Sequence, residues 1–137
     1  MELFHYHLVT SDVRHVEARY LGKLGFGLIA RYGRIGEVEG ERGETIWYLS
    51  GAGCSIGLRE AQSEGSFDRY RVGLHHLALE AGSRAVVNER AEWLRGQGAE
   101  IESGPEEYSY VPGYYAVFFY DPDGIKLEIV HVPGLAA

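Results

Sequence analysis

The residues with the clearest chemical potential lie near the end of the chain, in the segment 120–130, where Asp-Pro-Asp-Gly is followed by Ile-Lys-Leu-Glu-Ile-Val. Pro122 presets the backbone for a tight turn, and Gly124 tolerates positive φ at its end. The strand predicted after the turn alternates, so its large aliphatic residues face one side, while Lys126 and Glu128 face the other. A carboxylate in the middle of a strand lies either on a solvated face or in a polar site.

Two histidines on the first predicted strand, over residues 3–10, form a second group of candidates. His5 and His7 share one face with Val9, and the residues between them share the face that we expect to pack in the core. Imidazole is the commonest metal ligand in proteins and exchanges protons near neutral pH. A single strand histidine is more often structural, so the rest of the chain decides whether these two have a chemical role.

The elements that must position these residues follow one order in both halves of the chain. In the first half, a capping Ser11 or Asp12 and an apolar stripe predict a helix that ends at Gly25. In the second half, a similar stripe of Val87, Ala91 and Leu94 predicts a helix over residues 86–94. Strands are predicted around residues 27–32, 45–50, 55–60, 73–80, 99–103, 114–120 and 125–131, and the polar segment 61–72 is typical of a linker.

Each half therefore contains a strand, a helix and three further strands, which indicates an internal repeat of units of about 65–70 residues. An offset of 71 residues takes His5 to His76. The same offset takes Gly57 to Glu128. The repeat is supported by element order and by spacing together, because first strands align with first strands and last strands with last strands.

This pattern resembles the vicinal oxygen chelate superfamily, which includes glyoxalase I, bleomycin-resistance proteins, fosfomycin-modifying enzymes and extradiol dioxygenases. The resemblance rests on the first strand and helix with their Leu24-Gly25-Phe26 stop, on the segment 73–79, and on the turn 121–124 before Glu128. It covers nearly the whole chain. It implies an α+β fold, in which two βαβββ modules form curved mixed sheets around a cavity. The modules are expected at residues 1–66 and 67–137 of a single domain.

The resemblance also implies a metal site in that cavity. The family's ligand positions, carried over to this sequence, fall on His5, His76 and Glu128. The fourth family position falls on Gly57, which has no ligating side chain. Two imidazoles and one carboxylate suit a divalent ion of Fe, Mn, Ni, Co or Zn, and the open positions would accept two neighbouring substrate oxygens. The ion would stabilise an enediolate or catecholate as a Lewis acid.

Three further residues are candidates for catalysis. His7 is predicted on the cavity side of its strand, as an acid–base group or a partner of a ligand, and a register shift of two residues would make it the ligand instead of His5. Arg59 shares the parity of Gly57, so it can clamp an anionic substrate group or lie in solvent. Tyr114 belongs to the tyrosine-rich segment 104–115, which is predicted as a loop over the cavity or a subunit interface. His75 is expected to face the helix side and to be structural.

The composition of the chain limits its classes of binding partner and its cellular location. The net charge of −7 and the absence of a basic run argue against a nucleic-acid partner. No apolar run approaches the roughly 18 residues that cross a bilayer, and the start does not resemble a signal peptide, so we expect a cytoplasmic protein. One cysteine excludes an intrachain disulfide and a multi-cysteine zinc site. Exposed sheet edges and many aromatic residues predict a homodimer.

The favoured function is therefore a metal-dependent enzyme that acts on a small oxygenated substrate, with lyase or dioxygenase chemistry. The alternative is a non-catalytic protein that binds a drug or metabolite without a metal, as bleomycin-resistance proteins do. The missing fourth ligand at Gly57 counts against a standard glyoxalase I.

Overall fold

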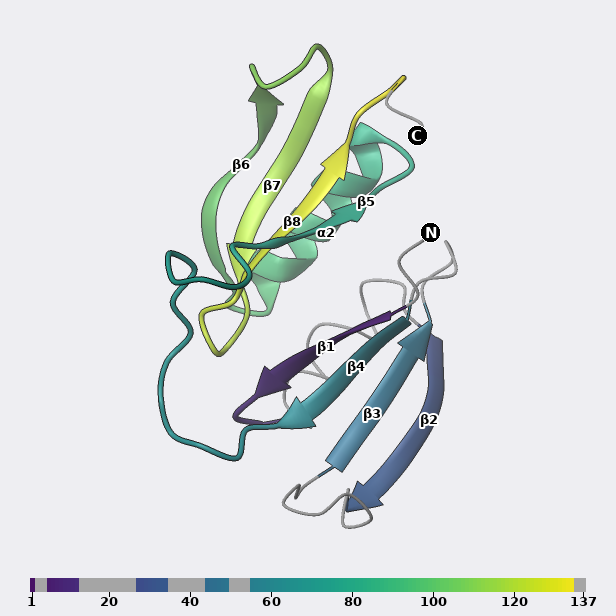
Figure 1. The fold of residues 1–137 in the computed structure, drawn as a ribbon. Coiled ribbons are helices and arrows are strands. Elements are labelled where there is room, and N and C mark those ends of the chain that lie inside the picture. Colours follow the sequence, from purple (N-terminus) through teal and green to yellow (C-terminus); the bar gives the residue numbers. More distant parts are fainter. Residues whose placement is uncertain (2–4, 13–26, 35–43, 50–54, 135–137) are drawn as a thin grey trace. The chain divides into compact units, whose positions relative to one another are not determined.

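The computed structural model describes residues 1, 5–12, 27–34, 44–49 and 55–134. The chain divides into two compact units, Met1–Gly65 and Ser66–Ala137. Each unit contains one four-stranded sheet (Figure 1). The two sheets have the same strand order, and the α+β fold class that the resemblance implies is confirmed.

The first unit contains strands β1 (His5–Thr10), β2 (Gly27–Arg34), β3 (Glu44–Leu49) and β4 (Ser55–Glu60), in the spatial order β1-β4-β3-β2. β1 and β4 are parallel and the other pairs are antiparallel. Leu8 and Thr10 are buried while Val9 between them is exposed, as the alternation predicts. The helix predicted after Ser11 lies outside the described residues.

The second unit contains strands β5 (Leu77–Glu80), β6 (Glu100–Tyr108), β7 (Tyr114–Tyr120) and β8 (Lys126–His131), in the order β5-β8-β7-β6. β5 and β8 are parallel, like β1 and β4. Gly57 pairs with His7, and Glu128 pairs with Ala78, so the register keeps the offset of 71 residues between the units. Positions equivalent by sequence are therefore equivalent in the sheets.

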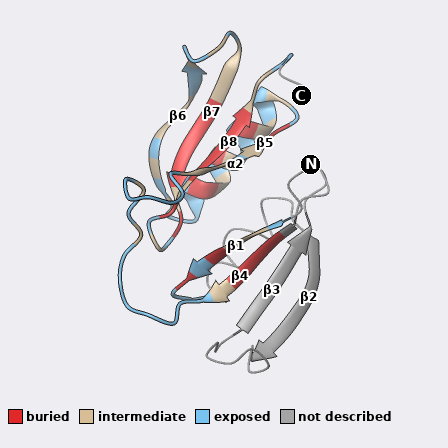
Figure 2. Ribbon diagram, in the orientation of Figure 1, coloured by how far each residue is buried: buried red, intermediate tan, exposed pale blue. Residues whose placement is uncertain are grey.

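Helix α2 (Arg84–Gly96) packs on one face of the second sheet (Figure 1). It begins because Ser83 is a capping residue whose hydroxyl accepts a hydrogen bond from the Val86 N–H at 3.2 Å. Its buried residues are Val87, Ala91 and Leu94, the three that the apolar stripe predicted. Buried residues also concentrate on β7 and β8 (Figure 2), so the core of this unit lies around these two strands.

The segment 104–115 differs from the prediction, because β6 continues through Gly104 and Pro105 to Tyr108. The β6–β7 pairing shifts register on both sides of Ser103, which is how a strand absorbs residues that break regular pairing. Gly104 has φ +86°, and a Cβ there would collide with the Ala116 carbonyl oxygen. The glycine and proline therefore mark an irregular strand, and the connecting loop is confined to residues 109–113.

The turn before β8 is organised by a buried carboxylate. Asp121 is 6% exposed, and its Oδ1 accepts hydrogen bonds from the N–H groups of Asp123 at 2.8 Å and Ile125 at 2.9 Å. Burial nevertheless raises the pKa of Asp121 to about 6, because loss of solvent opposes the charged form more strongly than the two donors favour it. Asp121 is therefore both the acceptor that closes the turn and a costly buried charge.

We expect Asp121→Ala to lower the free energy of unfolding by about 1–3 kcal/mol, because two N–H groups lose their acceptor. Asp121→Asn keeps an acceptor oxygen and is the matched control. Since the folded-state pKa is raised above the ordinary value of about 3.9, the folded chain binds the proton more tightly. The contribution of this group to stability therefore falls as the pH rises from about 4 to about 6.

Urea unfolding of the wild type and Asp121→Asn at several pH values measures this effect. The stability of Asp121→Asn relative to the wild type should rise across that pH window. A constant difference would show that the carboxyl group is not perturbed by burial.

Candidate functional site

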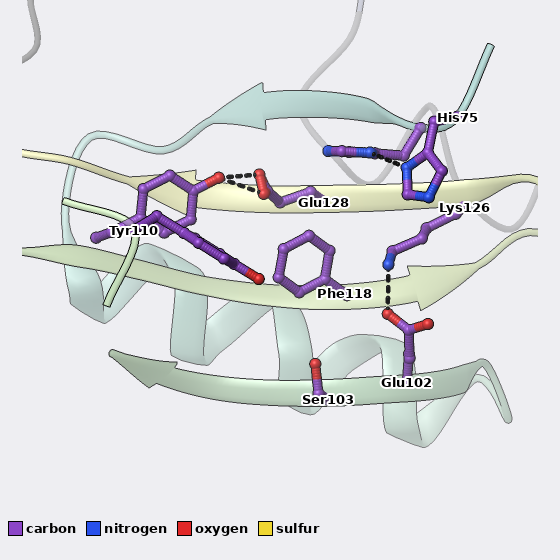
Figure 3. Close-up of a pocket in the computed structure, with 9 residues that line it drawn as sticks. His75, Glu102, Ser103, Tyr110, Phe118, Lys126 and Glu128 are labelled. Carbon is purple, nitrogen blue, oxygen red and sulfur yellow. Dashed lines mark hydrogen bonds and ion pairs between the residues drawn. The ribbon is translucent and has the colours of Figure 1, made fainter. Parts of the chain in front are cut away.

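A cavity of about 440 Å³ lies in the second unit, on residues from the segment before β5, the strands β6, β7 and β8, and the loop 109–113 (Figure 3). It is lined by His75, His76, Glu102, Ser103, Tyr110, Tyr114, Phe118, Lys126 and Glu128. Three of the residues singled out in the sequence, His76, Tyr114 and Glu128, therefore meet at one place.

The Glu128 side chain is fully buried in the wall of this cavity. The Tyr114 hydroxyl lies 2.5 and 2.6 Å from its two oxygens. Burial, followed by the hydrogen bond to Glu128, raises the pKa of Tyr114 well above its ordinary value, so the hydroxyl stays protonated and donates. A hydroxyl has one proton and can satisfy one carboxylate oxygen at a time. The buried carboxylate is thus poorly compensated within the described residues, which favours the binding of a cation there.

A pair of opposite charges, Lys126 and Glu102, also lines the cavity. Lys126 Nζ lies 2.6 Å from Glu102 Oε2 and 4.7 Å from the centre of the Phe118 ring (Figure 3). Burial alone would raise the pKa of Glu102, but hydrogen bonds from Lys126 and Tyr120 outweigh it and lower the pKa. Glu102 is therefore an anion paired with Lys126, whereas the carboxyl group of Glu128 is paired with the Tyr114 hydroxyl.

The two neighbouring histidines are in direct contact, with 2.7 Å between their Nδ1 atoms. The prediction that His75 faces the helix side was wrong: β5 begins only at Leu77, so strand alternation does not set the direction of residue 75. His75 lines the cavity together with His76. Desolvation, followed by the charges of His76 and Lys126, lowers the pKa of His75, which is therefore neutral at pH 7.

One wall of the cavity is aromatic. The Tyr108 and Tyr110 rings stack at 5.5 Å with an interplanar angle of 6°, and the Tyr110 ring meets Tyr114 edge-on at 5.1 Å. Tyr108 is anchored by a hydrogen bond of 2.6 Å between its hydroxyl and Ser103. Tyr110 is 65% exposed and thus offers ring surface to a ligand at the cavity.

The other predicted site residues belong to the first unit. His5 is exposed on β1, and its ring meets the His7 ring edge-on at 5.2 Å. Arg59 is half-buried on β4, in register with Val9. Within the described part of the chain, no three His, Cys, Asp or Glu side chains are grouped closely enough to hold a metal. The three-ligand set of His5, His76 and Glu128 therefore stays a prediction, of which two members share a cavity.

His7 and Gly57 are tightly coupled. They are paired across β1 and β4, and a Cβ added to Gly57 would lie 2.5 Å from Cε1 and Nδ1 of the His7 ring. Real Cβ atoms do not come this close, so any side chain at position 57 must displace the imidazole. The glycine predicted at the fourth ligand position is thus also the surface on which His7 packs.

We expect Gly57→Ala to lower the free energy of unfolding by about 1–3 kcal/mol through this overlap. Most of the loss should be absent when the same change is made in a His7→Ala background, because the colliding ring has gone. Urea unfolding of the two single variants and the double variant gives the coupling free energy. Additive effects would show that His7 does not pack on Gly57.

The described helix is too short to cross a membrane. Residues 2–129 match the family model of the Glyoxalase/Bleomycin resistance protein/Dioxygenase superfamily. The chain is 38% identical over 76 residues to the uncharacterized protein YqjT of Bacillus subtilis (strain 168), which is 55% of this chain and 59% of that protein, so the match spans less than two thirds of the relative.

Solved structures agree with this match. A glyoxylase/bleomycin resistance protein/dioxygenase domain from Frankia sp. EAN1pec has a TM-score of 0.80 at 27% identity, over 98% of this chain and 94% of that one. A glyoxalase family protein from Enterococcus faecalis has a TM-score of 0.73 at 24% identity, over 94% and 96%, and shows the likeness of fold.

Proposed function

Because this chain belongs to the Glyoxalase/Bleomycin resistance protein/Dioxygenase superfamily, we propose that it is a metal-dependent enzyme acting on a small molecule through two neighbouring oxygens. The observation that carries the proposal is the fully buried Glu128 carboxylate, which has a single hydroxyl donor among the described residues. It lines one cavity with His76. A carboxylate and an imidazole facing the same space form a donor set that fits a borderline divalent cation.

In this proposal His5, His76 and Glu128 hold one divalent ion of Fe, Mn, Ni, Co or Zn. When bound, the ion supplies Lewis-acid stabilisation of negative charge that develops on substrate oxygen. The register equivalence of the two units supports the choice of His5, because it stands where His76 stands in the other unit. Gly57 leaves the fourth position open.

The residues of the chain have separate roles around that centre. Tyr114 keeps its proton and donates a hydrogen bond to Glu128, which fixes the direction of the carboxylate; it is a hydrogen-bond donor and not a base. Tyr110 offers its exposed ring to an apolar part of the substrate. His7 is proposed as an acid–base group, and Arg59 as a clamp for a substrate anion.

The second candidate is a protein that sequesters a drug or metabolite without a metal. The exposed ring of Tyr110, which stacks on Tyr108, favours it, because exposed aromatic surface binds planar ligands whether or not a metal is present. The proposed enzyme and this binding protein differ in their need for a metal. A homodimer remains our expectation for either one.

The test is a screen of metal-depleted protein, reconstituted with each of the five metals, against thiol adducts, catechols and antibiotics. The proposal predicts turnover of one substrate class that disappears with a chelator and returns with one metal. Ligand binding that is unchanged by the chelator, with no turnover, would favour the sequestering protein.

A further inference from the structure

We infer that His75 is a positioning residue: its Nδ1 accepts a hydrogen bond from Nδ1–H of His76 and thereby leaves Nε2 of His76 as the atom that binds the metal. The inference rests on the proposed function, because it needs a metal at His76. It adds a residue that the sequence did not single out for chemistry.

The distance between the two Nδ1 atoms carries the argument. At 2.7 Å the two nitrogens share one proton, so one imidazole donates and the other accepts. Nδ1 of His76 is occupied in either case, and its remaining nitrogen is Nε2. If His75 donated, neutral His76 would carry its proton on Nε2 and could not bind a cation there. Metal binding by His76 therefore requires that His75 accept.

Packing holds the two rings in this arrangement. The rings of His75 and His76 meet at an interplanar angle of 79°, with centroids 5.0 Å apart. His75 is further contacted edge-on by Tyr70 at 5.7 Å, and His76 by Phe118 at 6.0 Å. Phe118 is buried in the sheet, so it gives His76 a fixed support at the cavity wall.

Metal-binding histidines in proteins usually have a hydrogen-bond partner at their second ring nitrogen. A ligating histidine usually donates its second ring N–H to a carboxylate, a carbonyl or water, which fixes its tautomer and orientation. Here the neighbouring imidazole takes that place. Loss of such a partner typically weakens metal affinity about 10–100-fold.

The first test is spectroscopic. In zinc-loaded protein with labelled histidine nitrogens, NMR at pH 8 should show His76 protonated on Nδ1 and bound through Nε2. It should also show His75 without a proton on Nδ1. A His76 bound through Nδ1, or a His75 protonated on Nδ1, would overturn the inference.

The second test compares zinc affinity among three variants whose fold is checked by circular dichroism. His75→Ala should bind zinc about 10–100-fold more weakly. His75→Asn should bind more tightly than His75→Ala, because its Oδ1 can occupy the place of Nδ1 and accept the same proton. His131→Ala removes a histidine that contacts the Ala81 carbonyl, outside the cavity lining, and should leave affinity unchanged.

The outcomes separate the two proposals. If the wild type binds zinc and a folded His75→Ala variant binds it equally well, the positioning role is wrong and the proposed function stands. If the wild type binds none of the divalent metals, the proposed function fails and the inference fails with it.

Discussion

The Glu128→Gln variant is expected to lose tight binding of divalent metal and, without metal, to be more stable than the wild type by about 1–2 kcal/mol. Glutamine keeps the shape of the side chain and its acceptor oxygen for Tyr114. It removes a charge that is fully buried and has one hydroxyl donor among the described residues. If Glu128 is present for metal binding, its replacement should lower metal affinity and raise the stability of the metal-free protein.

Glu102→Gln is the matched control, since it makes the same chemical change in the same cavity. Glu102 is already paired with Lys126 at 2.6 Å and accepts a hydrogen bond from Tyr120. The Lys126 side chain is only 13% exposed, and neutralising Glu102 removes its charged partner. The free energy of unfolding should therefore fall by about 0.5–1.5 kcal/mol. Metal affinity should change much less than in Glu128→Gln.

Urea unfolding in the presence of a chelator measures the stability of both variants. A Glu128→Gln variant that is clearly less stable than the wild type would assign the carboxylate a structural role. In that case Glu128 and Tyr114 would be a buried pair of the core and not part of a cation site.

The second large effect concerns the histidines. His5→Ala and His76→Ala are each expected to weaken metal affinity by more than about 100-fold, because each removes a bond to the metal. His7→Ala is expected to cost about 10–100-fold, the loss typical of a group that contacts a ligand. Because ligands act together, combining His5→Ala and His76→Ala should reduce activity little beyond either change alone.

Metal titration of the three variants at neutral pH distinguishes them, with Gly57→Ala as a comparison because it displaces His7 without removing it. A severe loss of metal affinity in His7→Ala, with a mild loss in His5→Ala, would show that the ligand on β1 is His7 and not His5. His7 would then be the residue that faces the metal, from its place beside Gly57.

Regular periodicity explains what the sequence predicted well. The stripe of Val87, Ala91 and Leu94 located α2, and β7 has the limits 114–120 that were expected. Glu128 and Lys126 were placed on one strand face by alternation, and both line the cavity. These predictions use neighbours along one element, where spacing alone determines direction.

Irregular backbone and long-range register explain what the sequence did not predict. Because β6 is irregular at Gly104 and Pro105, the sequence predicted that this strand ends before them. Because β5 begins only at Leu77, strand alternation could not predict that His75 lines the cavity. The contact between Tyr114 and Glu128 depends on the β7–β8 register, in which Phe118 lies opposite Glu128. The long tyrosine side chain then reaches along the strand, which no single-strand pattern specifies.

The most direct test of a metal site at Glu128 is calorimetric titration of metal-free wild type and Glu128→Gln with Mn, Fe, Co, Ni and Zn. We expect one ion per chain in the wild type for at least one of these metals, and no measurable tight binding in Glu128→Gln. Tight, stoichiometric binding that persists in Glu128→Gln would show that the buried carboxylate is not a ligand.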